Sequence, residues 1–208
     1  MTYQQIFDLD YVMRSIGRIA FPIFCYTLVE GFMKTRNVWK YLVRLILFGL
    51  ISEVPFDLCF NRTFWDPGSQ NVYFTLALGL MTLITVRGID NMQLNIQSEG
   101  LKRFLKVMLN LLAVAFFGTM ALLLHTDYVI LGIITIYLLY LGRKSRIGTL
   151  TAHAASCLIL EEIPALAGLI PLALYNGKRG LRMKYFFYAF YPGHILLIWI
   201  LSKYLGIA

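Results

Sequence analysis

Residues 16–33, IGRIAFPIFCYTLVEGFM, form the first long apolar stretch of the chain and decide its fold class. A helix of about 20 residues, rising roughly 1.5 Å per residue, crosses the hydrocarbon core of a bilayer. This stretch is nearly that long, yet it contains Arg18 and Glu30. Each charge costs about 3 kcal/mol in hydrocarbon, and about twelve residues of helix separate the two by roughly 18 Å. They cannot pair with each other, so each needs a partner from another helix, and the sequence predicts a bundle rather than a single anchor.

The composition is that of an integral membrane protein. Of the 208 residues, 59% are hydrophobic and 14% are charged, and the mean hydropathy is +0.68. A soluble domain of this size carries nearer to about a quarter charged residues. The net charge is +8, but the basic residues lie in short clusters between apolar runs, which is typical of cytoplasmic loops and argues against nucleic-acid binding. Three cysteines without CxxC spacing indicate neither a disulfide framework nor a metal site.

Eight apolar segments follow one another along the chain, and we expect each to be a helix. They are Ile16–Met33, Tyr41–Cys59, Val72–Val86, Leu105–Leu124, Tyr128–Gly142, Ile147–Leu160, Ile163–Tyr175 and Tyr185–Leu205. The sixth and seventh are short for a full crossing, so we expect them to be tilted, bent or re-entrant. The sequence therefore predicts an all-α polytopic bundle of about eight helices, forming a single integral membrane domain over residues 1–208.

The basic residues lie mainly in every second connection between these segments. The odd-numbered connections hold fifteen of the 19, namely Lys34, Arg36, Lys40, Arg44, Arg87, Lys102, Arg103, Lys106, Arg143, Lys144, Arg146, Lys178, Arg179, Arg182 and Lys184. This asymmetry predicts a multi-pass protein of a bacterial cytoplasmic membrane, with the basic loops cytoplasmic and both visible termini outside. Because no signal peptide precedes the outside N-terminus, we expect one further helix upstream of Met1.

The first two segments place opposite charges at the same membrane depths. If they are antiparallel, Arg18 lies near Glu53 and Asp57 at the outer side, and Glu30 lies near Arg44 at the inner side. Two interhelical ion pairs can then form. One interpretation is that these pairs only fix the hairpin. The other is that Arg18 or Glu30 lines a cavity that holds a polar ligand.

Other polar features of the first three segments bear on such a cavity. Pro22 and Pro55 interrupt two of the helices and free backbone carbonyls at membrane depth, which favours a cavity beside the charges. Asn71, at the outer end of the third segment, is a candidate ligand group. Thr75 and Thr82 lie on one face of that segment and are small, which favours close helix packing over a polar site.

The three histidines are the natural acids and bases of this sequence near neutral pH. His125 lies in HTDY, an outer loop where Asp127 can orient its ring. His153 lies among small residues in TAHAAS, where a packing role and a functional role are equally compatible with its surroundings. His194 lies behind Pro192 in FYPGHILLIW, roughly 13 Å from the inner end of the last span. It is the best functional candidate of the three.

The loop YNGKRG, residues 175–180, combines a turn signal with Lys178 and Arg179. This loop can bind anionic lipid, orient the protein by its charge, or hold a phosphate. With Arg36 and Lys40 on the same side of the membrane, a nucleotide-like cofactor such as coenzyme A is one further interpretation. The motifs GxxxxGK[ST], GxGxxG, HExxH and GxSxG are not found, so the sequence gives no support to nucleotide hydrolysis, dinucleotide redox chemistry, zinc proteolysis or serine-elbow hydrolysis.

Several of these stretches, taken in order, resemble the TraX family. They are IGRIAFPIF, EGFMKTRN, RLILFGLISEVPF, NVYFTLALGL, HTDYVILG, YNGKRG and KYFFYAFYPGHILLI, and together they cover nearly the whole chain. The family is named for a conjugation protein that acetylates the N-terminus of F-pilin, and it is distantly similar to membrane acyltransferases. The resemblance implies transfer of an acetyl or other acyl group from acyl-CoA to an amine or hydroxyl, on a pilin-like peptide or a surface glycan.

The resemblance also implies roles for individual residues. His194 would be a catalytic group, Arg18 and Glu30 match family positions in the bundle, and Arg36, Lys178 and Arg179 would hold the cosubstrate phosphates. Family members usually begin with a helix that carries an Asp-His pair, which this sequence lacks, so we expect a truncated and inactive enzyme unless such a helix lies upstream. A small-solute transporter, a channel, and a noncatalytic accessory of conjugation or surface assembly remain as alternatives, and the oligomeric state stays open.

Overall fold

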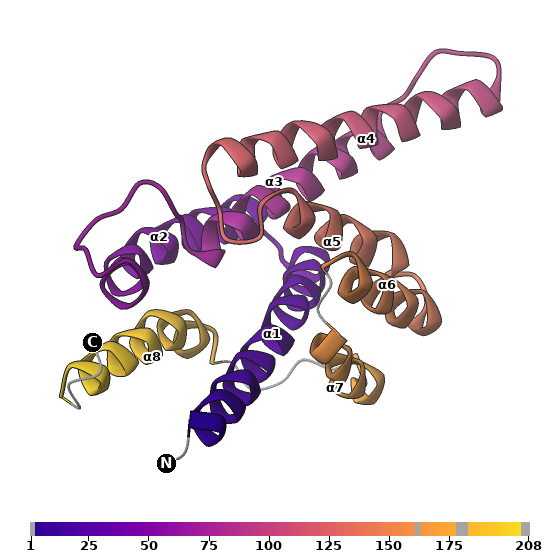
Figure 1. Ribbon diagram of the computed structural model, residues 1–208. Coiled ribbons are helices and arrows are strands. Elements are labelled where there is room, and N and C mark those ends of the chain that lie inside the picture. The colour runs from indigo at the N-terminus through magenta and orange to yellow at the C-terminus, as the bar shows by residue number, and fades with distance from the viewer. Residues whose placement is uncertain (1–2, 161–162, 178–182, 205–208) are drawn as a thin grey trace. The chain divides into compact units, whose positions relative to one another are not determined.

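The computed structural model describes residues 3–160, 163–177 and 183–204 (Figure 1), and its side chains are described from residue 19 onward, except that of Lys184. These residues form eight α-helices and no strand, which confirms the predicted all-α fold. The helices are α1 (Tyr3–Lys34), α2 (Val38–Phe56), α3 (Val72–Asn91), α4 (Glu99–Leu123), α5 (Val129–Gly142), α6 (Arg146–Ile159), α7 (Leu169–Leu174) and α8 (Lys184–Tyr204). A π-helical turn, η1 (Asp57–Asn61), extends α2, and a 3₁₀ turn, η2 (Ile163–Gly168), precedes α7.

Each predicted apolar segment contains a helix, and the boundaries differ where polar residues continue the helical pattern. The first helix starts at Tyr3, well before the apolar run, and α4 starts at Glu99 because Ser98 caps it by accepting a hydrogen bond from the Leu101 backbone N–H. The seventh segment is broken into η2 and α7, in agreement with the expectation that it is too short to cross a membrane as one helix.

Three helices are long and apolar enough to cross a membrane, namely α3, α4 and the Tyr185–Tyr204 part of α8. They are 20, 25 and 20 residues long. Together with the composition, these helices identify the chain as a membrane protein. The remaining helices are shorter or carry more charge, as α2 does with Lys40, Arg44 and Glu53.

The chain divides into two compact units, with the boundary inside α5. One unit lies within residues 1–34 and 134–178, and α1 packs there against η2 and α6. Phe21, Cys25, Leu28 and Phe32 recur on α1 at spacings of three and four and are at most 2% exposed. This spacing is that of one helix face, so α1 buries a continuous stripe in this unit.

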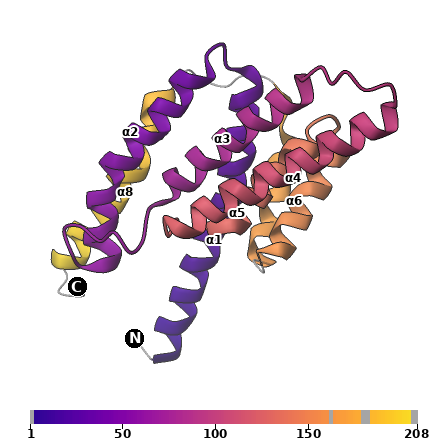
Figure 2. The same cartoon turned by 90° about the horizontal axis from the view of Figure 1, so that it is seen from above.

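The other unit lies within residues 35–133 and 179–208. Figure 2 shows α3 alongside α4, and α2 alongside α8, and α2 also packs on α3. Because α3 has neighbours on two sides, it is the most buried of the membrane-spanning helices. Gly49 of α2 allows a close approach to α3, since a side-chain Cβ at this position would lie 3.3 Å from the Cβ of Tyr73.

Candidate functional site

Two buried carboxylates lie one turn apart where α2 ends. Glu53 is 1% exposed and Asp57 is fully buried. Pro55, between them, lacks the N–H that the helical ladder requires, and the helix continues beyond Phe56 as the π turn η1. Asp57 begins that turn, and Arg62 ends it in the left-handed conformation with φ 55°. The proline thus separates α2 from a wider turn that carries the second carboxylate.

Side-chain amides and backbone N–H groups supply the donors for these carboxylates. The Asn71 amide nitrogen donates to Glu53 Oε2 and to the Gly49 carbonyl, the latter at 2.9 Å. The Asn61 amide nitrogen donates to Asp57 Oδ1 at 3.0 Å, and the Asp66 backbone N–H donates to Asp57 Oδ2 at 2.8 Å. Glu53 Oε1 is buried and accepts no hydrogen bond from the described residues. We call Glu53, Asp57, Asn61 and Asn71 the carboxylate cluster.

Asn71 also fixes the start of α3. Its side-chain oxygen accepts from the Tyr73 backbone N–H at 3.0 Å, which is the N-cap arrangement that asparagine favours. Asn71 is fully buried. A single side chain therefore caps α3, contacts the backbone of α2 and hydrogen-bonds the Glu53 carboxylate, so the sequence prediction that Asn71 is a structurally or functionally important polar group gains a geometric basis.

The connection between α4 and α5 lies beside the start of α3. The Gln70 backbone N–H donates to the His125 carbonyl at 2.9 Å, and the Tyr128 N–H donates to Thr75 Oγ1 at 3.5 Å. His125 and Val129 have positive φ angles of 50° and 42°. Such conformations are rare for non-glycine residues and outliers for β-branched ones, and strained positions of this kind cluster at functional sites. The sequence interpretation placed His125 and Asp127 in an exposed loop, and both are exposed.

Helix α8 brings aromatic side chains to the same unit. The Tyr191 ring packs edge-on against the Tyr73 ring at 5.2 Å. Since Pro192 has no N–H, the Tyr188 carbonyl four residues earlier has no helical donor. The Tyr73 hydroxyl replaces the missing N–H and donates to the Tyr188 carbonyl at 3.0 Å.

One described polar contact orients the His194 ring. Its Nδ1 lies 2.9 Å from the Phe190 carbonyl, which can only accept, so in the neutral ring Nδ1 carries the hydrogen and Nε2 has the lone pair. The ring stacks on Phe190 at 5.1 Å and meets Tyr191 edge-on at 5.6 Å. His194 is thus a half-buried, oriented imidazole whose free nitrogen can act as a base.

Four of the residues proposed from sequence therefore belong to one region of the second unit. Contacts run from Glu53 to Asn71, from Asn71 to Tyr73, from Tyr73 to Tyr191, and from Tyr191 to His194. The residue after Asp127, Tyr128, bonds to Thr75 of α3. The region contains a base, two carboxylates and phenolic and amide donors, which are the groups that proton transfer and group transfer require. No three His, Cys, Asp or Glu side chains of the described chain lie close enough together to hold a metal ion.

Glu30 lies in the other unit and has an ion pair within its own helix. Glu30 Oε2 lies 2.5 Å from Nζ of Lys34, one turn along α1. Lys34 also donates to the Tyr175 hydroxyl at 3.0 Å and the Gly177 carbonyl at 2.9 Å. The Glu30 carboxylate, followed by the Tyr175 hydroxyl, raises the pKa of Lys34. The Lys34 ammonium therefore connects the end of α1 with the segment that follows α7.

His153 also lies in that first unit and is fully buried in α6. Its Nε2 lies 3.2 Å from the Ala165 carbonyl, so Nε2 carries the proton, and Nδ1 is buried without a partner among the described residues. A Cβ added to Gly168 would lie 2.9 Å from Nε2. Glycine at this position thus lets η2 approach the imidazole, and the geometry is compatible with the packing role that the sequence left open.

The remaining predicted residues have fewer described contacts. The Arg44 guanidinium lies 5.9 Å from the centre of the Tyr41 ring and interacts with the Tyr188 hydroxyl. Arg36 is exposed between α1 and α2. Lys178 and Arg179 lie outside the described residues, as does the side chain of Arg18.

Sequence reasoning missed Tyr73, Tyr191 and Asn61, which complete the region. Pro192 in FYPGH does signal a free carbonyl at Tyr188, four residues before it, to which a nearby hydroxyl can donate. Nothing in the sequence places Tyr73 opposite that carbonyl. The contact depends on how α3 and α8 pack.

Comparison with known proteins gives the family. The model of the family described as TraX protein matches residues 2–202. The chain belongs to the TraX family. A TraX-like relative from Dichelobacter nodosus, described as "Probable fimbrial assembly protein FimC, serogroup H1", is 33% identical over 216 aligned positions, covering 89% of this chain and 81% of that protein. No solved structure matches this TraX protein.

Proposed function

We propose that this TraX protein is an integral membrane acyltransferase that moves an acetyl or other acyl group from acyl-CoA to an amine or hydroxyl acceptor. The observation that carries the proposal is the imidazole of His194, whose Nδ1–H is bound to the Phe190 carbonyl and whose Nε2 is free. A base in this fixed tautomer, next to a phenol and within a region that holds two buried carboxylates, is what acyl transfer to a neutral acceptor needs.

In the proposed reaction, His194 Nε2 takes the proton of the acceptor N–H or O–H as the acceptor attacks the thioester carbonyl carbon. The tetrahedral oxyanion then collapses, the carbon–sulfur bond breaks, and the thiolate of coenzyme A takes the proton from the imidazolium. Tyr191, whose ring meets the imidazole edge-on, would supply a hydroxyl donor to the oxyanion. The carboxylate cluster positions the start of α3, and through Tyr73 it positions Tyr191.

In this proposal the cosubstrate binds on the side of the membrane where the basic loops lie. Arg36, Lys178 and Arg179 would bind the phosphates of acyl-CoA, and the exposure of Arg36 supports this role. Arg18 and Glu30 are kept as catalytic candidates from the family resemblance. The loops that hold these basic residues would be cytoplasmic, in a bacterial inner membrane.

The description of the Dichelobacter nodosus relative supports the choice of the acyl acceptor. Similarity to a protein described as a probable fimbrial assembly protein supports a role connected with pili or conjugation. The proposed acceptor is therefore the amine of a pilin-like peptide, with a hydroxyl of a surface glycan as the second choice.

The test uses membranes that contain the full chain, isotope-labelled acetyl-CoA and a pilin-type peptide. Label should appear on the peptide, and His194→Ala should lower its rate at least a hundredfold, the usual range for loss of a general base. Added imidazole should restore part of the rate, which a purely structural loss would not allow. His125→Asn is the matched control, because asparagine tolerates the left-handed conformation at this exposed position.

Three results would overturn the proposal. The first is label transfer that His194→Ala leaves unchanged, and the second is a wild-type protein that labels neither peptide nor glycan. The third is solute flux through reconstituted vesicles without any acyl transfer, which would establish a transporter instead.

A further inference from the structure

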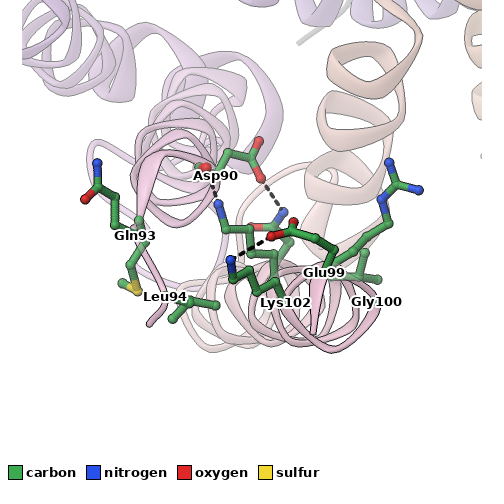
Figure 3. A pocket seen from close by; sticks show the side chains of 11 residues that line it. Asp90, Gln93, Leu94, Glu99, Gly100 and Lys102 are labelled. Atoms are coloured by element: carbon green, nitrogen blue, oxygen red, sulfur yellow. Dashed lines mark hydrogen bonds and ion pairs between the residues drawn. The ribbon is translucent and has the colours of Figure 1, made fainter. Parts of the chain in front are cut away.

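A cavity of about 850 Å³ opens where the α3–α4 hairpin turns, apart from the carboxylate cluster. Its lining includes Asp90, Glu99, Lys102, Arg103, Lys106 and Asn110. The lining extends from the last turn of α3 to the fourth turn of α4, so both helices and their connection form the walls (Figure 3).

The lining carries more positive than negative charge, with three basic and two acidic side chains. Lys102 is paired with Glu99 at 2.7 Å, and Lys106 Nζ donates to the Asp90 carbonyl at 2.6 Å; Figure 3 shows Glu99 and Lys102 directed toward each other. Arg103 has no partner among the described residues. Its guanidinium is therefore available to an anion, and its planar donors match a phosphate.

A buried polar group at the base of this cavity also lacks a partner. Asn110 is 7% exposed, and its amide nitrogen donates to Asp90 Oδ1 at 3.0 Å. Since a carboxylate can only accept, this bond fixes the orientation of the amide. The Asn110 Oδ1 is buried and accepts no hydrogen bond from the described residues. Because Oδ1 itself has no exposed surface, Asn110 forms a fixed part of the cavity wall, and the Arg103 guanidinium is the group that attracts a phosphate.

An apolar stripe of α4 adjoins the cavity. Leu101, Phe104, Met108 and Leu111 recur at spacings of three and four, and they are 47%, 59%, 42% and 50% exposed. At about 100° per residue, the stripe and the cavity-lining positions occupy neighbouring sectors of the helix. Val107 lies where the sectors meet, because it lines the cavity and is also 49% exposed.

From these features we infer that the cavity binds the headgroup of an anionic phospholipid of the phosphatidylglycerol type. Arg103 holds the phosphate, the glycerol headgroup lies in the cavity, and the acyl chains lie along the stripe from Val107 to Leu101 and Phe104. The excess of one positive charge in the lining favours a ligand with one negative charge over a zwitterionic lipid. The exposed stripe favours a lipid over a soluble phosphate ester, which would leave it uncovered.

The test measures lipid retention by native mass spectrometry of the purified full-length protein. It is titrated separately with phosphatidylglycerol, phosphatidylethanolamine and phosphatidylcholine. We expect phosphatidylglycerol to be retained in preference to the other two. Arg103→Gln should weaken its retention about tenfold, the loss expected for one charge-assisted contact. Leu94→Trp, in the loop between the helices, should fill the cavity and weaken retention without changing the charge.

Arg146→Gln is the matched control, because it removes the same charge from an exposed arginine of a different basic cluster, at the start of α6. Equal retention of all three lipids would overturn the inference. Equal effects of Arg103→Gln and Arg146→Gln would do so as well, since only the net charge would then matter. Displacement of phosphatidylglycerol by millimolar coenzyme A or glycerol 3-phosphate would show that the ligand is a soluble phosphate ester, and would overturn the lipid assignment.

Discussion

The Asn71 amide nitrogen donates to the buried carboxylate of Glu53, and the same side chain caps the helix that follows it. Asn71 is the one described side chain that donates to Glu53, and its amide also donates to the Gly49 carbonyl. Removing the amide takes this side-chain donor from a buried carboxylate and an acceptor from the N-cap, which is more costly than losing an exposed cap.

We expect Asn71→Ala to lower the free energy of unfolding by about 3 kcal/mol, of which a cap accounts for about 1 and the orphaned buried group for the rest. Thermal unfolding in detergent measures this. Asn37→Ala is the control, because Asn37 caps α2 at an exposed position and should cost only about 1 kcal/mol. Equal losses of unfolding free energy in the two variants would show that the contact with Glu53 contributes nothing to stability.

The fold class and the helix positions could be predicted from sequence, and the contacts within the site only in part. Apolar length and loop charge are local properties, which is why the segments around Val72 and Tyr185 are found within a few residues of the observed helices. The Glu53–Asn71 bond joins residues 18 positions apart, and Tyr73 meets the Tyr188 carbonyl over 115 positions. Such contacts depend on which helix faces pack together.

The pairing of Glu30 with Arg44 stays a prediction, and sequence reasoning overlooked a local partner of Glu30. Lys34 lies one turn after Glu30 on α1, where an ion pair needs no second helix. A partner four residues away in the sequence was therefore available before any interhelical one.

Close packing of α2 on α3 at Gly49 gives a second prediction. Gly49→Leu should destabilise the protein by about 1–3 kcal/mol, because the new side chain meets Tyr73 and Phe74. Gly88→Leu is the matched control in α3, where an added Cβ has no neighbour within 4 Å. Replacing this helical glycine should be neutral or stabilise by about 0.5–1 kcal/mol. Unfolding midpoints of the two variants that shift in the same direction would contradict the packing argument.

The carbonyl that Pro192 frees gives a third prediction. Tyr73→Phe removes the hydroxyl that serves the Tyr188 carbonyl and should cost about 1 kcal/mol. In a Pro192→Ala background the new N–H can donate to that carbonyl, so the same substitution should cost less. A double-mutant cycle measures the difference, and additive effects would mean that the hydroxyl is not replacing the missing helical donor.

The ion pair of Glu30 and Lys34 allows a structural role to be separated from a catalytic one. The pair is partly exposed, so Glu30→Gln and Lys34→Met should each cost less than about 1 kcal/mol of stability. If Glu30 takes part in acyl transfer, Glu30→Gln lowers the rate at least tenfold, whereas Lys34→Met, which breaks the same pair, does not. Equal rates in the two variants would restrict Glu30 to a structural role.

The distribution of basic residues predicts which connections face the cytoplasm, and two exposed positions can test it. Thr63 follows η1, between Asp57 and Asp66, and Gln97 precedes α4, between helix ends that carry Arg87 and Lys102. Basic loops are retained in the cytoplasm. In a Cys59→Ala background, where Cys25 and Cys157 are buried, a membrane-impermeant maleimide should label Thr63→Cys in intact cells. It should label Gln97→Cys only after the cells are permeabilised. The reverse pattern would invert the topology and move the Arg103 cavity to the opposite leaflet, whereas labelling of both positions in intact cells would mean that α3 does not cross the membrane.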